Sequence, residues 1–331
     1  MKNLIEWKKE IVSDVSVLSS LINLTNDEIL ALNTVKNKWA TTKHFISLMD
    51  KNLPSCPIRK QVIPSIKENV KGNEDYLLWK ENRKDSSMPD CIARQYNDRI
   101  AFLVSNVCSS YCRYCFRKEV ILDSLINLYL SFDQGFSWIK NHPEIRDVLI
   151  TGGDPLMLSN DKLHYIIGNL QEIPHIEMIR IGTRIPVVLP KRIDDEFLDI
   201  LKKFQRIPIW INIQCNHPKE ITPELKDIVF KLLCCGVNVG NQAVLLKGIN
   251  DDVDTLRILH QKLLSIRVRP YYLFQCEPAP GNDHFIVPMK KGCELIDNSL
   301  LKHTTGMARP HYVLATNKGK IPCRNLIGSE E

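Results

Sequence analysis

The sequence lacks the features that would place the chain in a membrane, on a secretory route or on a nucleic acid. It has no run of 18 apolar residues, so no membrane span is expected. The first residues, MKNLIEWKKEIVSD, carry scattered charges and no apolar core, unlike a signal peptide. The 44 Lys and Arg residues against 38 Asp and Glu leave a net charge of +6, and the basic residues form no concentrated stripe. We therefore predict a cytoplasmic protein with no membrane and no nucleic-acid partner.

Internal repeats and low-complexity segments are also absent. Hydrophobic residues make up 44% and charged residues 25% of the chain, an ordinary globular mixture that excludes disordered and collagen-like classes. The length of 331 residues suits one large α/β domain with appendages, or two domains.

The chain divides into three regions by its patterns. Residues 1–98 are polar, rich in Lys and Glu and helically patterned, and are predicted to form a helical cap or lid. Within them, Thr25 and Glu28 have the spacing of a capping box at a helix start. Residues 99–290 alternate short β-rich runs with helical segments, and residues 291–331 form a C-terminal tail.

The central region predicts βα units with a parallel sheet, whose active-site groups lie at the carboxyl ends of the strands. Six strands are fewer than the eight of a closed barrel, so we predict a partial (βα)6 barrel of TIM type. The predicted strands are Ile100–Val107, Val148–Thr151, Met178–Gly182, Ile209–Gln214, Val237–Leu246, Val268–Phe274 and, in the tail, Tyr312–Thr316. The predicted helices between them are Ser131–Asn141, Leu163–Glu172, Asp194–Lys203, Pro223–Cys235 and Asp252–Leu264.

Cysteine is abundant for a chain expected in a reducing compartment, and most of the eleven are predicted to be buried as small apolar side chains. Cys108, Cys112 and Cys115 differ because they fall within eight residues, just past the first predicted strand. Thiolates are soft ligands that suit zinc or iron–sulfur clusters. A structural zinc site needs four ligands, and no fourth Cys or His lies nearby, whereas three ligands on a four-iron cluster leave one iron open. Three buried cysteines at a strand end remain the alternative interpretation.

The spacing Cys-x3-Cys-x-aromatic-Cys resembles the signature of radical S-adenosylmethionine (SAM) enzymes, and the string CSSYCRYCFRKEV is similar to the lysine 2,3-aminomutase family. The resemblance continues in order through DVLITGGDPLM, RIGTRIPVVLPKRI, CNHPKE, GNQAVLLKGIND, VRPYYLFQCE and GKIP. It covers roughly residues 90–325 and implies a partial (βα)6 radical SAM barrel. The length and the Cys-Arg-Tyr-Cys-Phe-Arg string are more similar to the compact branch that makes (R)-β-lysine for elongation factor P, whereas the Gln-Cys-Glu and Gly-Asn-Gln segments are more similar to the enzymes that act on free lysine.

The resemblance implies a [4Fe–4S] cluster held by Cys108, Cys112 and Cys115, with SAM on the fourth iron. It places Tyr114 near the adenine of SAM. Reductive cleavage of SAM is chemistry that no side chain could supply. A one-electron donor such as flavodoxin or ferredoxin is therefore expected as a partner.

Two further segments are implied to contact SAM. Gly152, Gly153 and Asp154 follow the second predicted strand in a Gly-Gly-Asp-Pro segment, which by itself is typical of a turn. The resemblance places these three residues at the SAM ammonium group. It also places His217 and Gln242 near SAM, although a histidine that caps a loop is the alternative for His217.

Pyridoxal 5'-phosphate (PLP) is the third implied cofactor. The resemblance assigns Lys320 as the PLP lysine, with Lys318 as the fallback, and Arg99 with Tyr96 to the PLP phosphate. A lysine that attacks an aldehyde must be neutral, so its site must lower its pKa. Arg117 is implied to bind the substrate α-carboxylate through its planar guanidinium group.

Two positions depart from the family pattern. Gln95 stands where the family often has a second basic residue for the PLP phosphate, and Arg94 is the neighbouring cation that could compensate. Family members acting on lysine hold its distal ammonium between two aspartates, whereas here Glu277 keeps one carboxylate and Ala315 replaces the other. A single carboxylate can bind a guanidinium group through two hydrogen bonds, so arginine rivals lysine as the substrate, and glutamate is disfavoured.

We therefore predict a PLP-dependent radical SAM amino acid 2,3-aminomutase, an isomerase whose small-molecule substrate is an amino acid with a cationic side chain. The alternative is another radical SAM enzyme of a biosynthetic pathway that uses the same core on a different amino acid. A non-catalytic protein that binds zinc or a cluster is a third hypothesis. The sequence leaves open whether the chain forms a homodimer.

Overall fold

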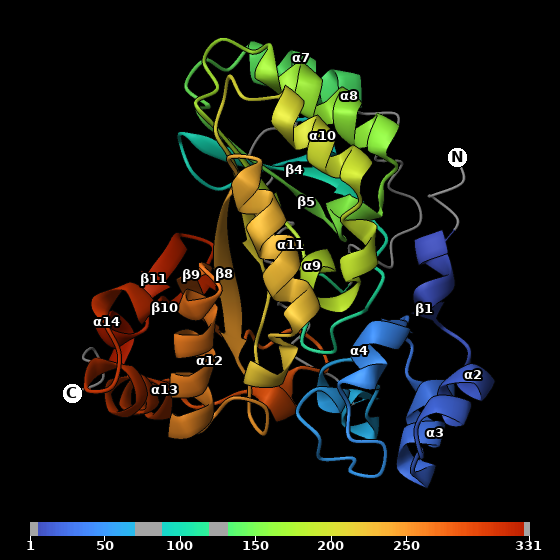
Figure 1. Ribbon diagram of the computed structural model, residues 1–331. Helices are drawn as coiled ribbons and strands as arrows, with labels where there is room; N and C mark the ends of the chain where they lie inside the picture. Colours follow the sequence, from blue (N-terminus) through green and yellow to red (C-terminus); the bar gives the residue numbers. More distant parts are fainter. Residues whose placement is uncertain (1–5, 70–87, 119–131, 328–331) are drawn as a thin grey trace.

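The computed structural model describes residues 6–69, 88–118 and 132–327, and these residues form one large sheet of nine strands (Figure 1). The strand order is β11-β10-β9-β8-β7-β6-β5-β4-β3. The seven strands from β4 to β10 run parallel, and β3 and β11 at the edges run antiparallel to their neighbours. The bounds are β3 (Ile92–Arg94), β4 (Arg99–Ser105), β5 (Asp147–Gly152), β6 (Met178–Gly182), β7 (Ile209–Ile213), β8 (Asn238–Leu245), β9 (Arg269–Gln275), β10 (His311–Thr316) and β11 (Gly319–Pro322).

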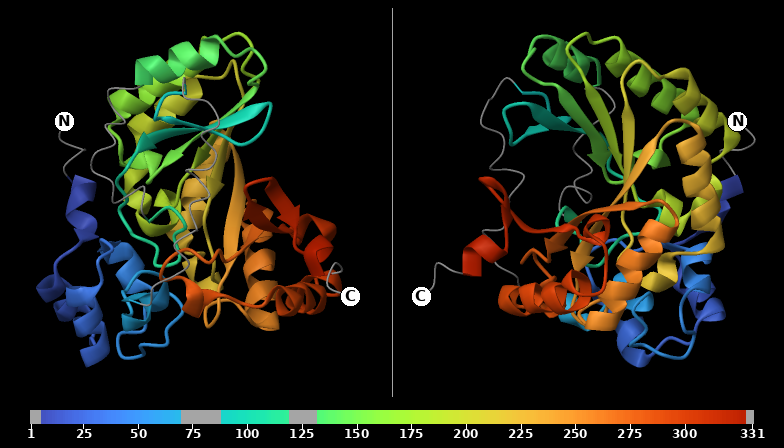
Figure 2. Two further views of the ribbon diagram at one scale, coloured as in Figure 1. Left: turned by 180° about the vertical axis from the view of Figure 1, so that it is seen from behind. Right: turned by 60° about the vertical axis from the view of Figure 1, so that its left-hand side comes forward.

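The sheet curls into an open half barrel, with helices along its outer side (Figure 2). The central helices are α7 (Phe132–Lys140), α8 (Asn160–Gln171), α9 (Ile185–Val188), α10 (Asp195–Lys203), α11 (Pro223–Cys234) and α12 (Val253–Ser265), followed by α13 (Met289–Ile296) and α14 (Arg324–Ile327). This confirms the predicted α/β class and the partial barrel of six parallel βα units, β4 to β9. Among the described residues, no helix is long and apolar enough to cross a membrane.

The sheet extends beyond the six predicted barrel strands. The tail strand β10 was predicted, but the short edge strands β3 and β11 were not. Gly319 adopts a φ of 108°, which lets the chain turn back so that β11 pairs with β10 as a hairpin. The segment from Gly319 to Pro322 reads as a loop in sequence, because its strand form depends on the pairing with β10.

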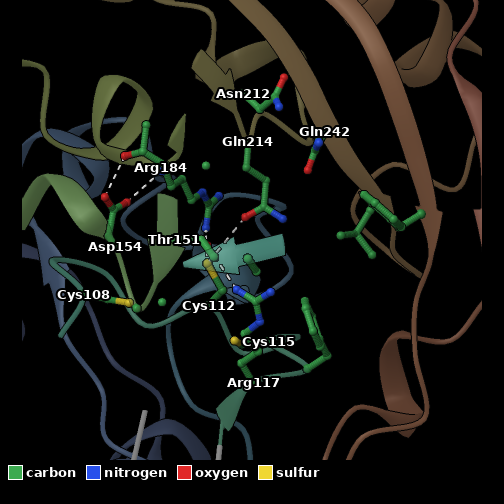
Figure 3. Close-up of a pocket in the computed structure, with 18 of the residues that line it drawn as sticks. Cys108, Cys112, Cys115, Arg117, Thr151, Asp154, Arg184, Asn212, Gln214 and Gln242 are labelled. Atoms are coloured by element: carbon green, nitrogen blue, oxygen red, sulfur yellow. Dashed lines mark hydrogen bonds between the residues drawn. The ribbon is translucent and has the colours of Figure 1, made fainter. Parts of the chain in front are cut away.

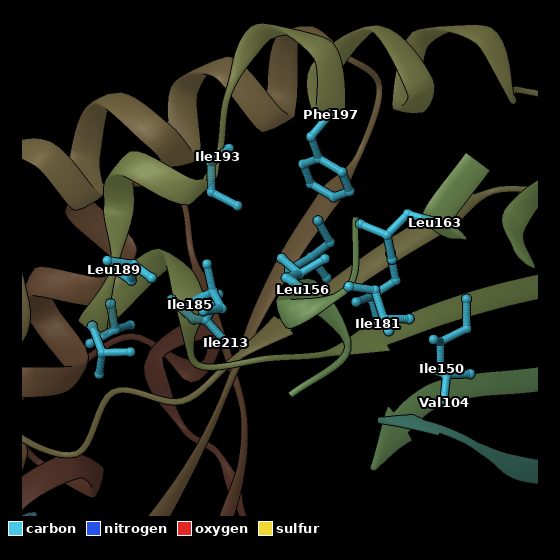
Figure 4. Close-up of a cluster of buried hydrophobic side chains, with 14 of the residues drawn as sticks. Val104, Ile150, Leu156, Leu163, Ile181, Ile185, Leu189, Ile193, Phe197 and Ile213 are labelled. Atoms are coloured by element: carbon cyan, nitrogen blue, oxygen red, sulfur yellow. The ribbon is translucent and has the colours of Figure 1, made fainter. Parts of the chain in front are cut away.

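Successive side chains of a parallel strand point to opposite faces of the sheet, so each strand has an apolar outer face and an inner face that lines the half barrel. Ile150 and Ile181 are paired in register on β5 and β6, and both are fully buried. Figure 4 shows them packed with Leu163 of α8 and Phe197 of α10. Each such apolar side chain stabilises the fold by roughly 1.5–3 kcal/mol when fully buried. The intervening strand residues face inward, where the site forms.

The N-terminal residues pack as short helices and a two-stranded sheet, β1 (Ile11–Val12) with β2 (Thr41–Thr42). The helices are α2 (Val15–Leu21), α3 (Asn26–Thr34) and α4 (Lys43–Ser47). The capping box at the start of α3 is confirmed, because Thr25 accepts the Glu28 N–H while the Glu28 carboxylate accepts the Thr25 N–H at 2.8 Å. Glu28 also pairs with the buried Arg59. The predicted region boundaries at residues 98 and 290 stay predictions.

We expect Thr25→Ala to lower the free energy of unfolding by about 1 kcal/mol, because the Glu28 N–H loses its acceptor. Urea denaturation of the iron-free protein measures this loss. The control is Thr34→Ala at the exposed C-terminal end of the same helix, expected to change stability by less than about 0.5 kcal/mol. Equal effects of the two substitutions would show that the capping box does not stabilise α3.

Candidate active site

A cavity of about 400 Å³ runs along the inner face of the half barrel. Its walls include Thr151 and Gly182 at the carboxyl ends of β5 and β6, as the parallel sheet predicts. It also reaches Arg99, the first residue of β4, so the site is not confined to the carboxyl ends of the strands. The cysteine loop after β4 and Lys320 of β11 line the same cavity.

Cys108, Cys112 and Cys115 are unpaired thiols that all line this cavity, and its described lining contains no fourth cysteine. Figure 3 shows Cys108 apart from the other two. Within the described ranges, no three Cys, His, Asp or Glu side chains lie close enough together to hold a single metal ion. A four-iron cluster is larger than one ion and takes each thiolate on a different iron. Three separate thiols facing one cavity therefore suit a cluster better than zinc.

Desolvation raises the pKa of the Cys108 thiol and raises the pKa of Cys115 to about 11. Without a positive partner these half-buried thiols are protonated at neutral pH. Iron binds the thiolate and supplies the missing positive charge, so the donor set fits a metal cluster. The Arg184 guanidinium already lies beside Cys112, with Nη1 at 2.9 Å from Sγ (Figure 3).

The Gly-Gly-Asp segment at the end of β5 packs directly on the end of β4 and the start of the cysteine loop. Gly152 has a φ of 135°, and a Cβ there would lie 2.2 Å from the Ser105 carbonyl oxygen. A Cβ on Gly153 would lie 2.6 Å from the Val107 carbonyl oxygen. The buried Asp154 carboxylate accepts hydrogen bonds from Thr183 Oγ1 at 2.7 Å and from the Arg184 N–H at 2.8 Å. The segment thus fixes the loop against β6, and its contact with SAM stays a prediction.

Polar side chains at the ends of the next strands face the same part of the cavity. Gln242 on β8 lines it, as does Tyr114, whose hydroxyl accepts a hydrogen bond from Asn216 at 2.6 Å. Arg184 Nε and Asn212 Nδ2 are buried donors with no hydrogen-bond partner in the part of the chain that the structure describes. These orphan donors suit the oxygen atoms of a polar ligand.

Sequence reasoning missed Arg184 and Asn212. A signal for Asn212 was present, because it is the one polar residue in the buried run Ile209–Ile213. His217 was assigned near SAM, but it is not among the described residues that line the cavity. Its imidazole accepts the Lys219 N–H and caps a short 3-10 helix, the geometry of the alternative interpretation. Its role stays a prediction.

Cations gather in the part of the cavity near the C-terminal hairpin. Lys320 lies opposite Ala315 in the β10–β11 register, and burial together with Arg180, Arg99 and Arg117 lowers its pKa to about 8. Among them, Arg180 was missed by sequence reasoning. It lies in the middle of β6, where a lone cation in an otherwise apolar strand was the available signal.

The aromatic and polar neighbours of Lys320 hold its strand in place. Tyr96 accepts the Lys320 N–H at 3.0 Å and stacks under the Arg99 guanidinium at 3.8 Å. The Gln95 amide donates to the Thr316 carbonyl oxygen. Arg94 does not line the cavity, because its guanidinium binds Glu144 and the carbonyl groups of the adjacent turn.

The two residues assigned to the substrate also line the cavity. Arg117 donates to Thr151 Oγ1 at 3.1 Å. Glu277 is buried, and its Oε2 has no hydrogen-bond partner among the described residues. Burial without a cation raises the pKa of Glu277 to about 8. A buried carboxyl group of this kind gains most from a cationic ligand.

We expect Gly152→Ala to destabilise the iron-free protein by about 2 kcal/mol or more, since alanine strains a positive φ and meets backbone that cannot move away. The control is Gly306→Ala, where a Cβ meets nothing within 4 Å. Thermal unfolding followed by circular dichroism measures both. Similar melting temperatures for the two variants would contradict the close packing of the end of β5 on the end of β4.

Known proteins resemble this chain over most of its length. A family profile described as the radical SAM superfamily matches residues 102–258. The chain is 41% identical over 324 residues to the L-lysine 2,3-aminomutase of Fusobacterium nucleatum subsp. nucleatum, covering 96% of this chain and 75% of that protein. It is 40% identical over 325 residues to the L-lysine 2,3-aminomutase of Clostridium subterminale, covering 96% and 77%. It is 41% identical over 312 residues to the glutamate 2,3-aminomutase of Clostridioides difficile, covering 93% and 72%.

These relatives are named aminomutases, which are isomerases, and the superfamily implies a [4Fe–4S] cluster and SAM as cofactors. The cavity offers three free thiols and orphan polar donors for such groups. The confirmed half barrel and the identity over nearly the whole chain agree, and the chain belongs to the lysine 2,3-aminomutase family of the radical SAM superfamily.

Proposed function

We propose that the protein is a PLP-dependent 2,3-aminomutase that converts an L-α-amino acid with a cationic side chain to its β-amino acid. The observation that carries the proposal is the sharing of one cavity by the cysteine loop, a lysine with a lowered pKa and a single buried carboxyl group. When bound, the cluster and SAM would supply a radical that abstracts hydrogen, and the π-system of PLP would delocalise the unpaired electron while the amino nitrogen migrates.

The residues assigned to the cofactors fit this role in their chemistry. Cys108, Cys112 and Cys115 are the candidate iron ligands. Lys320 is the candidate PLP lysine, because its lowered pKa leaves far more neutral amine at pH 7–8 than an ordinary lysine has. A PLP phosphate needs donors, and Arg99 and the newly found Arg180 lie close to Lys320, each paired through one nitrogen with a carboxylate, Asp98 and Asp147 respectively.

The substrate would be bound at both of its ends. Arg117 can bind the α-carboxylate, since it lies in the cavity wall and lends its positive charge to the surroundings of Lys320. Glu277 can bind the distal cation, which would satisfy its unpartnered oxygen. Ala315 leaves room for either an ammonium or a guanidinium group, so lysine and arginine are both candidates. A glutamate side chain would instead be repelled by an ionised Glu277.

An electron donor and a reducing compartment are both expected from this chemistry. A cluster that must be reduced needs a one-electron donor such as flavodoxin or ferredoxin. Free thiols that bind iron need a reducing compartment such as the cytoplasm.

We expect the protein, reconstituted with iron without oxygen, to bind about four irons per chain. With SAM, PLP and a reductant it should then form a β-amino acid from lysine or arginine, but not from glutamate. Product analysis over lysine, arginine, ornithine and glutamate tests this. Cleavage of SAM with no β-amino acid from any of them would support the other radical SAM reaction instead. Zinc without iron after anaerobic purification would overturn both.

We expect Lys320→Ala to abolish the visible absorption of bound PLP, because the other two lysines of the described cavity lining, Lys38 and Lys118, lie outside the β10–β11 hairpin. Lys318→Ala is the matched control, two residues away in the exposed turn, and should keep the absorption. In the unsubstituted protein the binding rate should rise with pH and level off above about 8, the pKa of Lys320. Retained absorption in Lys320→Ala would remove Lys320 from this role.

The KM for a cationic substrate should rise as the pH falls below about 8. In the empty cavity the Glu277 carboxyl group is protonated below about pH 8, so Glu277 must lose its proton before it can pair with a cation. This raises KM by up to about tenfold for each pH unit below 8. In Glu277→Gln this part of the dependence should vanish and KM should be raised about tenfold or more. Unchanged pH profiles in that variant would show that Glu277 does not face the substrate cation.

A further inference from the structure

The cysteine loop is attached to the N-terminal region by a buried ion pair that no cofactor assignment uses. Arg113 lies between the second cysteine and Tyr114, and its side chain reaches Glu68. Arg113 Nε lies 2.9 Å from Glu68 Oε1, and Nη2 lies 2.5 Å from Oε2. The remaining terminal nitrogen donates to the Lys38 carbonyl oxygen at 2.9 Å. All three nitrogen atoms of the guanidinium group are therefore bound to the N-terminal region.

Both side chains of this pair are almost completely withdrawn from water, with exposed fractions of 2% for Arg113 and 0% for Glu68. The Ser65 N–H donates to the same carboxylate at 3.0 Å, and Lys118 lies 3.9 Å away. A buried ion pair with this many hydrogen bonds fixes the geometry of both partners. Removal of one partner leaves an uncompensated charge in the interior, so the pair opposes separation of the loop from the N-terminal region.

Backbone hydrogen bonds fix the same loop at two more points. The Tyr111 N–H donates to the Ala40 carbonyl oxygen at 3.0 Å, and the Arg113 N–H donates to the Gln61 carbonyl oxygen at 2.8 Å. The two bonds lie on either side of Cys112. That cysteine is therefore positioned by residues that precede the barrel.

The Gln61 side chain also forms hydrogen bonds with residues of the barrel. Its Oε1 accepts from Arg184 Nη2 at 2.6 Å and from Asn216 Nδ2 at 3.0 Å, while its Nε2 donates to Glu220 at 2.9 Å. The same Arg184 holds the Cys112 sulfur. Residues 38–69, the cysteine loop and two strand ends of the barrel thus form one continuous hydrogen-bonded unit.

We infer that residues 38–69 position the cysteine loop for its cluster, with Arg113 and Glu68 as the positioning pair. The inference rests on the iron cluster assigned to this site, but not on the substrate or on PLP. Three thiolates on one loop bind a single cluster tightly only if the loop is held in the binding conformation before iron arrives, because otherwise binding must order it. The N-terminal region is then a fixed wall of the cluster site, whereas the sequence suggested a cap or lid.

The test compares two buried Arg–Glu pairs of the same region. Glu68→Gln removes the charge that holds Arg113, and Glu28→Gln removes the charge that holds Arg59, whose described contacts lie within the N-terminal region. We expect both variants to melt at a lower temperature without iron. After anaerobic reconstitution, we expect only Glu68→Gln to release iron to a chelator at least about tenfold faster than the unsubstituted protein. Equal rates of iron release in the two variants would overturn the inference.

A second measurement needs no substitution and covers the case in which Glu68→Gln does not fold. Hydrogen exchange followed by mass spectrometry compares the unsubstituted protein with and without reconstituted iron. Binding that depends on residues 38–69 must stabilise them in return, so their amides should exchange more slowly with iron bound, while those of 15–34 change little. Unchanged exchange in 38–69 would overturn the inference. A protein that holds iron in this way but makes no β-amino acid would refute only the proposed function.

Discussion

The parallel pairing of β4 to β9 is the constraint on which the site depends. It brings the ends of six strands to one edge of a curled sheet, and strand alternation then sends every second side chain into the half barrel. On β6, Ile179 and Ile181 pack outward while Arg180 and Gly182 line the cavity. Alternate residues of the same strands therefore form the apolar core and the polar wall of the cavity, and one sheet supports both.

The titratable groups of the cavity form two sets: thiols without a positive partner, and a lysine close to several arginines. On one side the thiols of Cys108 and Cys115 have raised pKa values and lack a positive partner, which iron would supply. On the other side burial, together with the charges of Arg180, Arg99 and Arg117, lowers the pKa of Lys320 and favours its neutral form. Glu277 is the buried acid that none of these cations reaches with a hydrogen bond in the described structure. A ligand that carries both a carboxylate and a distal cation would complement the cations and Glu277 together.

The sequence predicted the strands and helices with periodic hydrophobicity well, and it predicted the edge hairpin and the long-range polar contacts less well. Each of the six barrel strands and every central helix except the short α9 was predicted within a few residues, because hydrophobic periodicity records which face of an element is buried. The hairpin strand β11 was missed, since only its pairing with β10 makes Gly319–Pro322 extended. Arg184 and Arg113 were missed for a similar reason: their partners, Gln61 and Glu68, lie far away in the chain. The resemblance pointed to residues most of which line the cavity, whereas such long-range polar contacts leave no local pattern.

The hairpin also links two features that the sequence presents separately. Ala315 and Lys320 are paired across β10 and β11, so their side chains lie on the same face of the hairpin. An acid at position 315 would sit beside the lysine amine and stabilise its protonated form. The small apolar residue therefore adds no acid beside Lys320, whose pKa is lowered by burial and by Arg180, Arg99 and Arg117 against the opposing charge of Asp147. The departure from the family pattern at position 315 therefore affects the protonation of Lys320.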